Sequence, residues 1–120
     1  MSHSTLSAVV PLLKVKSIPT SIGFYEKLGF EVANSFTPEG APEPQWASLM
    51  AGPVEIMLGA STEARGSAPD ALYLYSGNLE QMHSRAEQAG LAPSAISRPF
   101  FNPDGEFELT DPDGHPIYVA

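Results

Sequence analysis

A helix pattern that occurs twice constrains the fold of this chain more than any other feature. In the first copy, Ser17 can cap the amino end of a helix, Pro19 suits the first turn, and an apolar stripe ends at Gly29. The second copy begins 61 residues later at Asn78 and ends at Gly90, with cap, stripe and glycine in the same relative positions. The sequence therefore predicts an internal duplication. Because each half is too small to bury a core alone, we expect the halves to share one.

The segments around each helix repeat the order strand, helix, strand, strand, strand. The expected strands are 8–15, 30–36, 46–51 and 54–58 in the first half, and 71–75, 94–97, 105–110 and 116–119 in the second. Turn residues separate them, and the proline-rich run 37–44 predicts a loop. We therefore expect one domain over residues 1–120, with a first module at about 7–58, a linker at about 59–70 and a second module at about 71–120.

Composition excludes several classes of function. A hydrophobic content of 42% with 17% charged residues is not that of a disordered chain, and no apolar run approaches the roughly 20 residues of a membrane span. We see no secretory signal, and the absence of cysteine removes disulfides and thiolate chemistry. The net charge of −8 argues against nucleic-acid binding and is compatible with attraction of a cationic small molecule, or simply with solubility. We expect a cytoplasmic protein with no nucleic-acid or membrane partner.

Three stretches are characteristic, namely Pro-Leu-Leu-Lys-Val-Lys-Ser at 11–17, Ser-Ile-Gly-Phe-Tyr-Glu-Lys-Leu-Gly-Phe-Glu-Val at 21–32 and Phe-Glu-Leu-Thr-Asp-Pro-Asp-Gly-His-Pro-Ile at 107–117. Together they resemble the glyoxalase/bleomycin-resistance/dioxygenase superfamily, also called vicinal oxygen chelate proteins. The resemblance covers nearly the whole chain and implies an α+β fold. Two βαβββ modules would form a curled, half-open mixed β-barrel around a cavity, with the helices outside and a dimer completing it. Function is less constrained, because members range from metal enzymes to binding proteins without metal.

The resemblance also implies metal-ligand positions on the first and last strands of each module. In this sequence they fall on Val10, Ala71, Tyr118 and Ile56, or on Met57 if one hairpin is a residue longer. None of these side chains offers an ionised oxygen or an imidazole nitrogen to a divalent ion. Glu55 is adjacent, but only a register slip would turn it inward, and that slip would leave Ile56 outward. We therefore expect neither a metal nor another cofactor.

The remaining polar residues do not predict a catalytic set. His3, His83 and His115 lack ligand spacing; we expect His83 to pack against the sheet and His115 to be solvated. Asp111 and Asp113 lie in a tight turn, where Asp usually caps backbone N–H groups. A serine or threonine nucleophile would need an activating imidazole and a carboxylate, which cannot be identified. No catalytic residue is assigned.

The predicted cavity lining is aromatic and acidic. If Ala71 faces the cavity as the resemblance implies, alternation places Tyr73 and Tyr75 on the same side and turns Leu72 and Leu74 toward the helix. The same reasoning places Val10 and Leu12 inward, and two aromatic residues at the cavity mouth. The predicted ligand-binding residues, which share an inward or mouth position, are Phe36, Trp46, Met57, Tyr73, Tyr75, Glu106, Glu108 and Tyr118.

Aromatic faces beside carboxylates suit a planar or cationic ligand, through stacking and cation–π attraction of roughly 0.5 to 2 kcal/mol per contact. We expect a metal-independent homodimer that binds a small organic molecule, and the resemblance makes sequestration of a cationic aromatic antibiotic its most concrete version. A metal-dependent lyase, isomerase or dioxygenase is the alternative, so enzymatic activity stays open. A dimeric interaction module with a vestigial cavity is a third reading. The aromatic residues would also be explained if they simply filled the barrel or the dimer seam.

Overall fold

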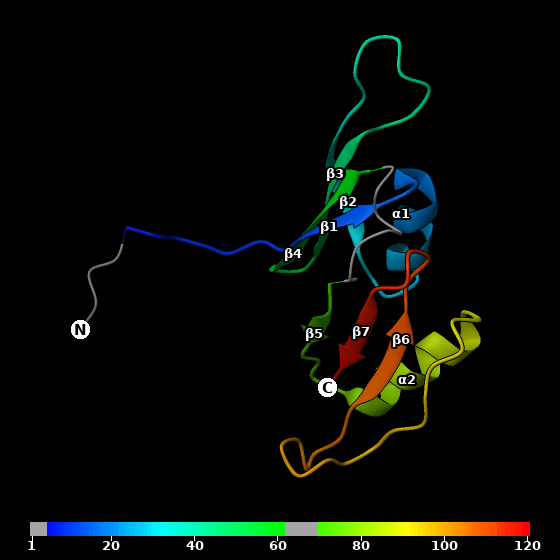
Figure 1. Cartoon of the computed structure of the whole chain (residues 1–120). Coiled ribbons are helices and arrows are strands. Elements are labelled where there is room, and N and C mark those ends of the chain that lie inside the picture. Colours follow the sequence, from blue (N-terminus) through cyan, green and yellow to red (C-terminus); the bar gives the residue numbers. More distant parts are fainter. Residues whose placement is uncertain (1–4, 62–69) are drawn as a thin grey trace.

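The fold consists of two sheets, each with one helix packed on one of its faces (Figure 1). The computed structural model describes residues 5–61 and 70–120. The elements are β1 (Leu12–Val15), α1 (Ile18–Glu26), β2 (Glu31–Phe36), β3 (Trp46–Ala51), β4 (Val54–Ala60), β5 (Leu72–Leu74), α2 (Leu79–Gln88), β6 (Phe107–Thr110) and β7 (Pro116–Val119). This order confirms the α+β class and the two βαβββ-like modules, whose sheets remain open.

The two sheets have related but unequal topologies. The first has the strand order β1-β4-β3-β2, with β1 parallel to β4 and the other pairs antiparallel. The second has the order β5-β7-β6, with β5 parallel to β7. The strand expected at 94–97 is reduced to a single bridge between Ser97 and Glu106. Pro93 and Pro99 flank this segment, and because proline has no N–H to donate, little room is left for a ladder.

Both helix ends match the duplicated pattern. The Ser17 hydroxyl accepts a hydrogen bond from the backbone N–H of Thr20 at 3.3 Å, and the Asn78 side chain accepts one from Gln81 at 3.0 Å. Gly29, after the first helix, has φ of +107°, a conformation that a side chain would strain. Caps and glycine stops were therefore predicted correctly from the sequence.

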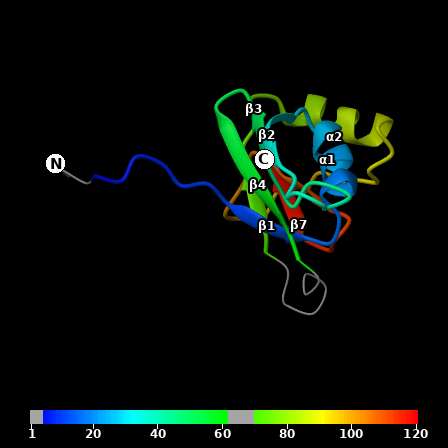
Figure 2. The ribbon, with the colours of Figure 1, turned by 90° about the horizontal axis from the view of Figure 1, so that it is seen from above.

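The first strand is shorter than expected. It begins at Leu12, and the Pro11 carbonyl just before it accepts a hydrogen bond from the Met57 N–H at 2.9 Å. Proline cannot donate in return, so the parallel ladder ends there. Residues 5–11 lead away from the sheet (Figure 2). The expected start of this strand at residue 8 is wrong, because Val10 precedes the paired part, and the inward orientation of Val10 stays a prediction.

The core lies between each sheet and its helix. Alternate strand residues are buried there, among them Leu13, Leu49 and Ile56 in the first module and Phe107 and Ile117 in the second. Figures 1 and 2 show α1 and α2 on the same side of the molecule. The opposite faces of both sheets therefore point away from the helices and lie side by side. No helix within the described ranges is long and apolar enough to cross a membrane.

The Asp-Pro-Asp-Gly turn of the second module anchors the first module. Asp111 accepts from the backbone N–H groups of Asp113 and His115, each at 2.9 Å, which confirms the predicted capping role. Its other carboxylate oxygen accepts from the buried Tyr25 hydroxyl at 2.8 Å, and Asp113 accepts from the Lys16 N–H at 2.9 Å. Burial, and then the charge of Asp111, raise the pKa of Tyr25 far above its ordinary value.

His115 extends the same junction. It is only 3% exposed, so the prediction of a solvated histidine is wrong. Its Nδ1 accepts from the Asp70 N–H at 3.0 Å, which leaves the ring hydrogen on Nε2 to be donated to the Lys14 carbonyl at 2.8 Å. The sequence could not show this burial, because it depends on the first module packing over the turn.

Candidate ligand-binding site

Three tyrosines form a stacked surface on the uncovered face of the second sheet. Tyr73 and Tyr118 are register partners on β5 and β7, and their ring centroids lie 4.7 Å apart with planes inclined by 13°. The Tyr75 ring continues the stack, 6.3 Å from that of Tyr73. Glu108 on β6 is the register partner of Tyr118 and extends the same row to an exposed carboxylate. As predicted, Leu72 and Leu74 alternate with these tyrosines and turn to the helix side.

A second carboxylate is held within this group. Glu106 is only 7% exposed, and its Oε1 accepts hydrogen bonds from the Tyr73 hydroxyl and from the Asn102 amide, both at 3.2 Å. Reduced solvation and the adjacent Glu106 charge raise the pKa of Tyr73, which favours the protonated phenol that donates to Glu106. The tyrosine surface therefore ends at a carboxylate whose position is fixed.

Sequence reasoning missed the loop 98–105, which supports this carboxylate. Asn102 belongs to it, and so does Gly105, whose φ is +106° and where a Cβ would lie 3.1 Å from side-chain atoms of Leu79 and Ile96. The run Asn102-Pro103-Asp104-Gly105 indicated a turn, but nothing in it identified the partner of the amide. Phe100, on the same loop, is 96% exposed and lies edge to face with Phe101 at 5.4 Å.

The other predicted residues form a separate group on the uncovered face of the first sheet. Phe36 and Trp46 are register partners at the ends of β2 and β3 that adjoin the proline-rich loop. Met57 lies on the same face, in the next row, opposite Leu12 of β1. Ile56 is buried in the core, so of the two alternatives for this position it is Met57 that lies on the open face.

Glu55 also lies on this open face, and its predicted orientation is wrong. Because Ile56 and Leu58 are the core residues of β4, the odd-numbered positions must face away from the helix. The Ser48 hydroxyl donates to Glu55 Oε2 at 2.7 Å. One carboxylate with Met57 and no imidazole does not suit a divalent ion. Within residues 5–61 and 70–120, no group of three or more His, Asp or Glu side chains is arranged to hold a metal.

The two groups do not meet within one chain. Trp46 and its neighbours lie on the first sheet and the stacked tyrosines on the second, and no hydrogen bond or ring contact joins them in the described part of the structure. Since both uncovered faces point away from the helices, the groups are side by side and not opposed. Within the described residues, neither group covers the other.

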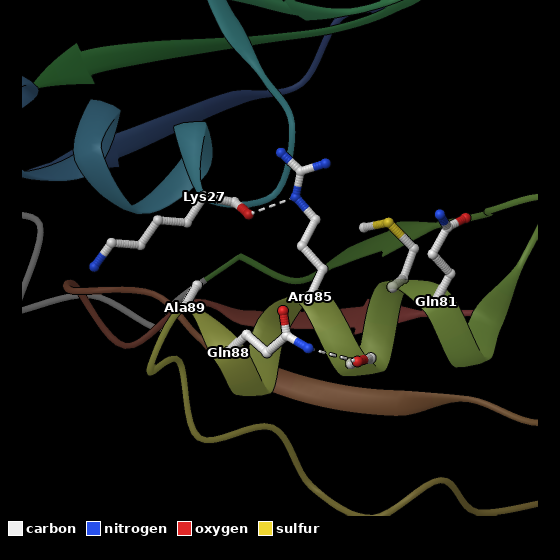
Figure 3. Close-up of a pocket in the computed structure, with 7 residues that line it drawn as sticks. Lys27, Gln81, Arg85, Gln88 and Ala89 are labelled. Carbon is white, nitrogen blue, oxygen red and sulfur yellow. Dashed lines mark hydrogen bonds between the residues drawn. The ribbon is translucent and has the colours of Figure 1, made fainter.

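The helix side of the molecule carries a polar groove at the module junction (Figure 3). Arg85 Nε donates to the Lys27 carbonyl at 3.0 Å and so links α2 to the end of α1. The groove has a volume of about 690 Å³ and is lined by Lys27, Gln81, Met82, Ser84, Arg85, Gln88 and Ala89. None of the predicted ligand-binding residues lies there. Nearby, His83 packs edge to face on Phe107 at 5.0 Å with Nε2 2.8 Å from the Ser94 carbonyl, as predicted.

The fold and this site define an open-sheet protein with an aromatic and acidic surface and no recognisable metal centre in the described residues. Residues 6–119 match the Glyoxalase/Bleomycin resistance protein/Dioxygenase superfamily. The chain belongs to this superfamily, as the sequence motifs predicted. No curated protein sequence matches it.

Solved structures share the architecture at low sequence identity. A bleomycin resistance determinant encoded on the transposon Tn5 superposes with a TM-score of 0.79 at 17% identity, covering 95% of this chain and 96% of that one. A bleomycin-binding protein from Streptomyces verticillus, complexed with copper(II)-bleomycin, has a TM-score of 0.77 at 16% identity, with 98% and 97% covered. A glyoxalase family protein from Enterococcus faecalis has a TM-score of 0.77 at 20% identity, with 96% of this chain and 97% of that one covered. These likenesses are likenesses of fold.

Proposed function

We propose that this protein binds a small, planar, cationic organic molecule without using a metal. The observation that carries the proposal is the stack of Tyr73 on Tyr118 beside the held carboxylate of Glu106. Tyrosine faces attract cations and flat rings, at roughly 0.5 to 2 kcal/mol per contact. A carboxylate at the edge of such a surface adds a charged hydrogen-bond acceptor for an amidinium, guanidinium or ammonium group.

The charge of the molecule supports the same ligand class. The net charge is −8, and exposed Glu108 lies directly beside Tyr118. A negative surface raises the local concentration of cations and speeds their association. An anionic or strongly polar ligand would meet repulsion here and would gain little from the tyrosine rings.

A homodimer completes the site in this proposal. The tyrosine group and the group of Phe36, Trp46 and Met57 lie side by side in one chain, and both leave apolar area uncovered. A second copy that lays its first sheet over the second sheet of its partner would enclose a ligand between the two groups, and the symmetry would generate two such sites. The phenylalanine and tryptophan rings would then form the wall opposite the tyrosines.

Structural neighbours favour one concrete version, namely sequestration of an antibiotic such as bleomycin. Two proteins of this fold are a bleomycin resistance determinant and a bleomycin-binding protein. Titration calorimetry with metal-free bleomycin tests this version, and benzamidinium tests the wider class of planar cations. Absence of heat with bleomycin would leave only the wider class, and absence with both would reject the proposal. A stoichiometric divalent ion whose removal by a chelator abolishes binding would contradict metal independence.

Charge removal provides a matched test. Glu108→Gln should weaken benzamidinium binding about two- to tenfold, because it removes an exposed carboxylate beside the stack. Glu26→Gln also removes one negative charge, but from the exposed surface of α1 on the helix side, and should leave the affinity for benzamidinium unchanged. Equal losses in both variants would mean that only net charge matters and that the tyrosine surface is not the site.

A further inference from the structure

An apolar hollow separates the two modules beside the stacked tyrosines. Its volume is about 400 Å³, at the small end of the roughly 300 to 1,000 Å³ of ligand pockets. The first module contributes Leu28 and Phe30 after its helix and Ala51 and Val54 from the β3–β4 turn, and the second contributes the end of β5, Met82 and Val119. No Asp, Glu, Lys or Arg among the described residues lines it, in contrast to the polar groove of Figure 3.

Two hydrogen bonds join the modules at other parts of the junction. Tyr25 with Asp111 clamps the modules at the Asp-Pro-Asp-Gly turn, and Arg85 with the Lys27 carbonyl clamps them at the helix ends. Leu28, Phe30 and Val119 are almost fully buried, so the inner wall is core-like. Well-packed interiors contain few voids larger than a water molecule, and apolar walls gain free energy when an apolar group replaces water. An apolar group of a ligand would fill this void and would replace water along its apolar walls.

The polar atoms at the hollow have little to offer a charged group. Ser76 uses its N–H and its hydroxyl on the Ala120 carbonyl, at 2.6 and 3.0 Å. Tyr73 already donates to Glu106. Tyr75 is the remaining hydroxyl, and its ring is mostly exposed at the edge of the hollow. The chemistry of the lining therefore selects an uncharged aryl or alkyl group.

Tyr73 and Tyr75 line the hollow and also belong to the stacked surface, so the two places are continuous. We infer that the ligand has two parts: a planar cation that lies on Tyr73 and Tyr118, and an uncharged apolar group that enters the hollow between the modules. The cationic part of this inference rests on the function proposed above. The apolar part rests on the junction alone.

Three probes separate the two parts. Methylguanidinium carries only the cation, butylbenzene only the apolar group, and (4-phenylbutyl)guanidinium carries both. Calorimetry should show that the linked probe binds at least tenfold more tightly than methylguanidinium. In protein labelled with ¹³C at the methionine methyl groups, butylbenzene and the linked probe should shift the Met82 signal, and methylguanidinium should not.

A substitution that fills the hollow with a larger side chain tests the apolar part of the inference. Val54→Phe should remove the advantage of the linked probe and leave methylguanidinium binding unchanged. Val32→Phe is a matched control, because Val32 and Val54 are both 42% exposed strand residues and Val32 does not line the hollow. If Val54→Phe unfolds, Ala51→Leu narrows the same wall; unfolding midpoints and sedimentation of each variant establish that fold and oligomeric state are retained.

The outcomes are distinct. If neither cation binds but butylbenzene shifts Met82 in a manner blocked by Val54→Phe, the apolar site stands and the proposed cationic function fails. If methylguanidinium binds and the linked probe gains nothing, or gains equally in Val54→Phe, the inference about the hollow is wrong while the proposed function stands. If butylbenzene leaves Met82 unmoved at saturation of its solubility, the hollow is not a ligand site.

Discussion

Single residues in this protein show how strictly buried polar atoms are paired. Asp111 satisfies two backbone N–H groups and the Tyr25 hydroxyl, and His115 uses both ring nitrogens. Ser21 is the exception among the described residues: it is completely buried, and its hydroxyl has no hydrogen-bond partner. A buried hydroxyl without a partner is unfavourable by about 1 to 3 kcal/mol.

Ser21→Ala should therefore increase the free energy of unfolding by about 1 kcal/mol, since it removes the unpaired hydroxyl and alanine has the higher helix propensity. Urea denaturation followed by circular dichroism measures this. Ser17→Ala, in the same helix, should have the opposite effect, a loss of about 1 kcal/mol, because Ser17 caps the helix. A destabilised Ser21→Ala would show that this hydroxyl has a partner in solution.

The buried Tyr25 predicts the response to alkali. Its pKa is raised in the folded state, so above about pH 10 the unfolded chain loses the proton and the folded chain keeps it. The folded state then binds more protons, and the free energy of unfolding must decrease as pH increases. Tyr25→Phe should be less stable at pH 7, but its stability should decline less steeply between pH 10 and 11. Parallel pH profiles for the two proteins would contradict the raised pKa.

At the level of helices and strands, local sequence determined what could be predicted. Caps and glycines specified both helices, and alternation specified which residues of β5 face the helix. Two strands were overestimated because prolines limit their ladders: β1 stops where Pro11 ends its ladder with β4, and Ser97, between Pro93 and Pro99, makes only one bridge. In the candidate site, the alternation of the strand correctly predicted that the tyrosines share one face. The hydrogen bond from Asn102 to Glu106 could not be predicted, because it depends on the conformation of a loop, which no sequence periodicity indicates.

Gly105 is the position on which that loop depends. Gly105→Ala should lower the free energy of unfolding by roughly 1 to 3 kcal/mol, because it places a side chain at positive φ and 3.1 Å from Leu79 and Ile96. It should also weaken benzamidinium binding, since Glu106 follows directly. Gly77→Ala is the control. The added Cβ would meet nothing within 4 Å, so the free energy of unfolding should change by less than about 0.5 kcal/mol.

For the molecule as a whole, the resemblance correctly predicted two βαβββ modules with open sheets and the helices outside, but the side-chain contacts that join the modules could not be predicted. The duplication indicated two similar halves, but the contacts that join them involve partners far apart in the chain, such as Arg85 and Lys27. The same arrangement sets the tyrosine group and the Trp46 group side by side, so our proposal of a shared site requires a second copy.

Sedimentation equilibrium tests the proposed homodimer, and the expected mass is that of two chains. Phe36→Glu should shift the equilibrium toward monomer and weaken benzamidinium binding, because it places a charge on the exposed, uncovered face of the first sheet. Val32→Glu introduces the same charge on the same strand but on its other face, opposite Leu49, and should leave the dimer intact. A monomeric parent protein that binds benzamidinium fully would contradict the shared site.

The Tyr25–Asp111 hydrogen bond joins residues 86 positions apart. During synthesis the first helix leaves the ribosome long before its acceptor exists, so the phenol must wait in water, or be buried unpaired, until the last turn emerges. A product cut short before residue 111 would lack that acceptor and the Asp113 oxygen that receives the Lys16 N–H. The amino-terminal half therefore depends on the Asp-Pro-Asp-Gly turn for the partners of the Tyr25 hydroxyl and of the Lys16 N–H.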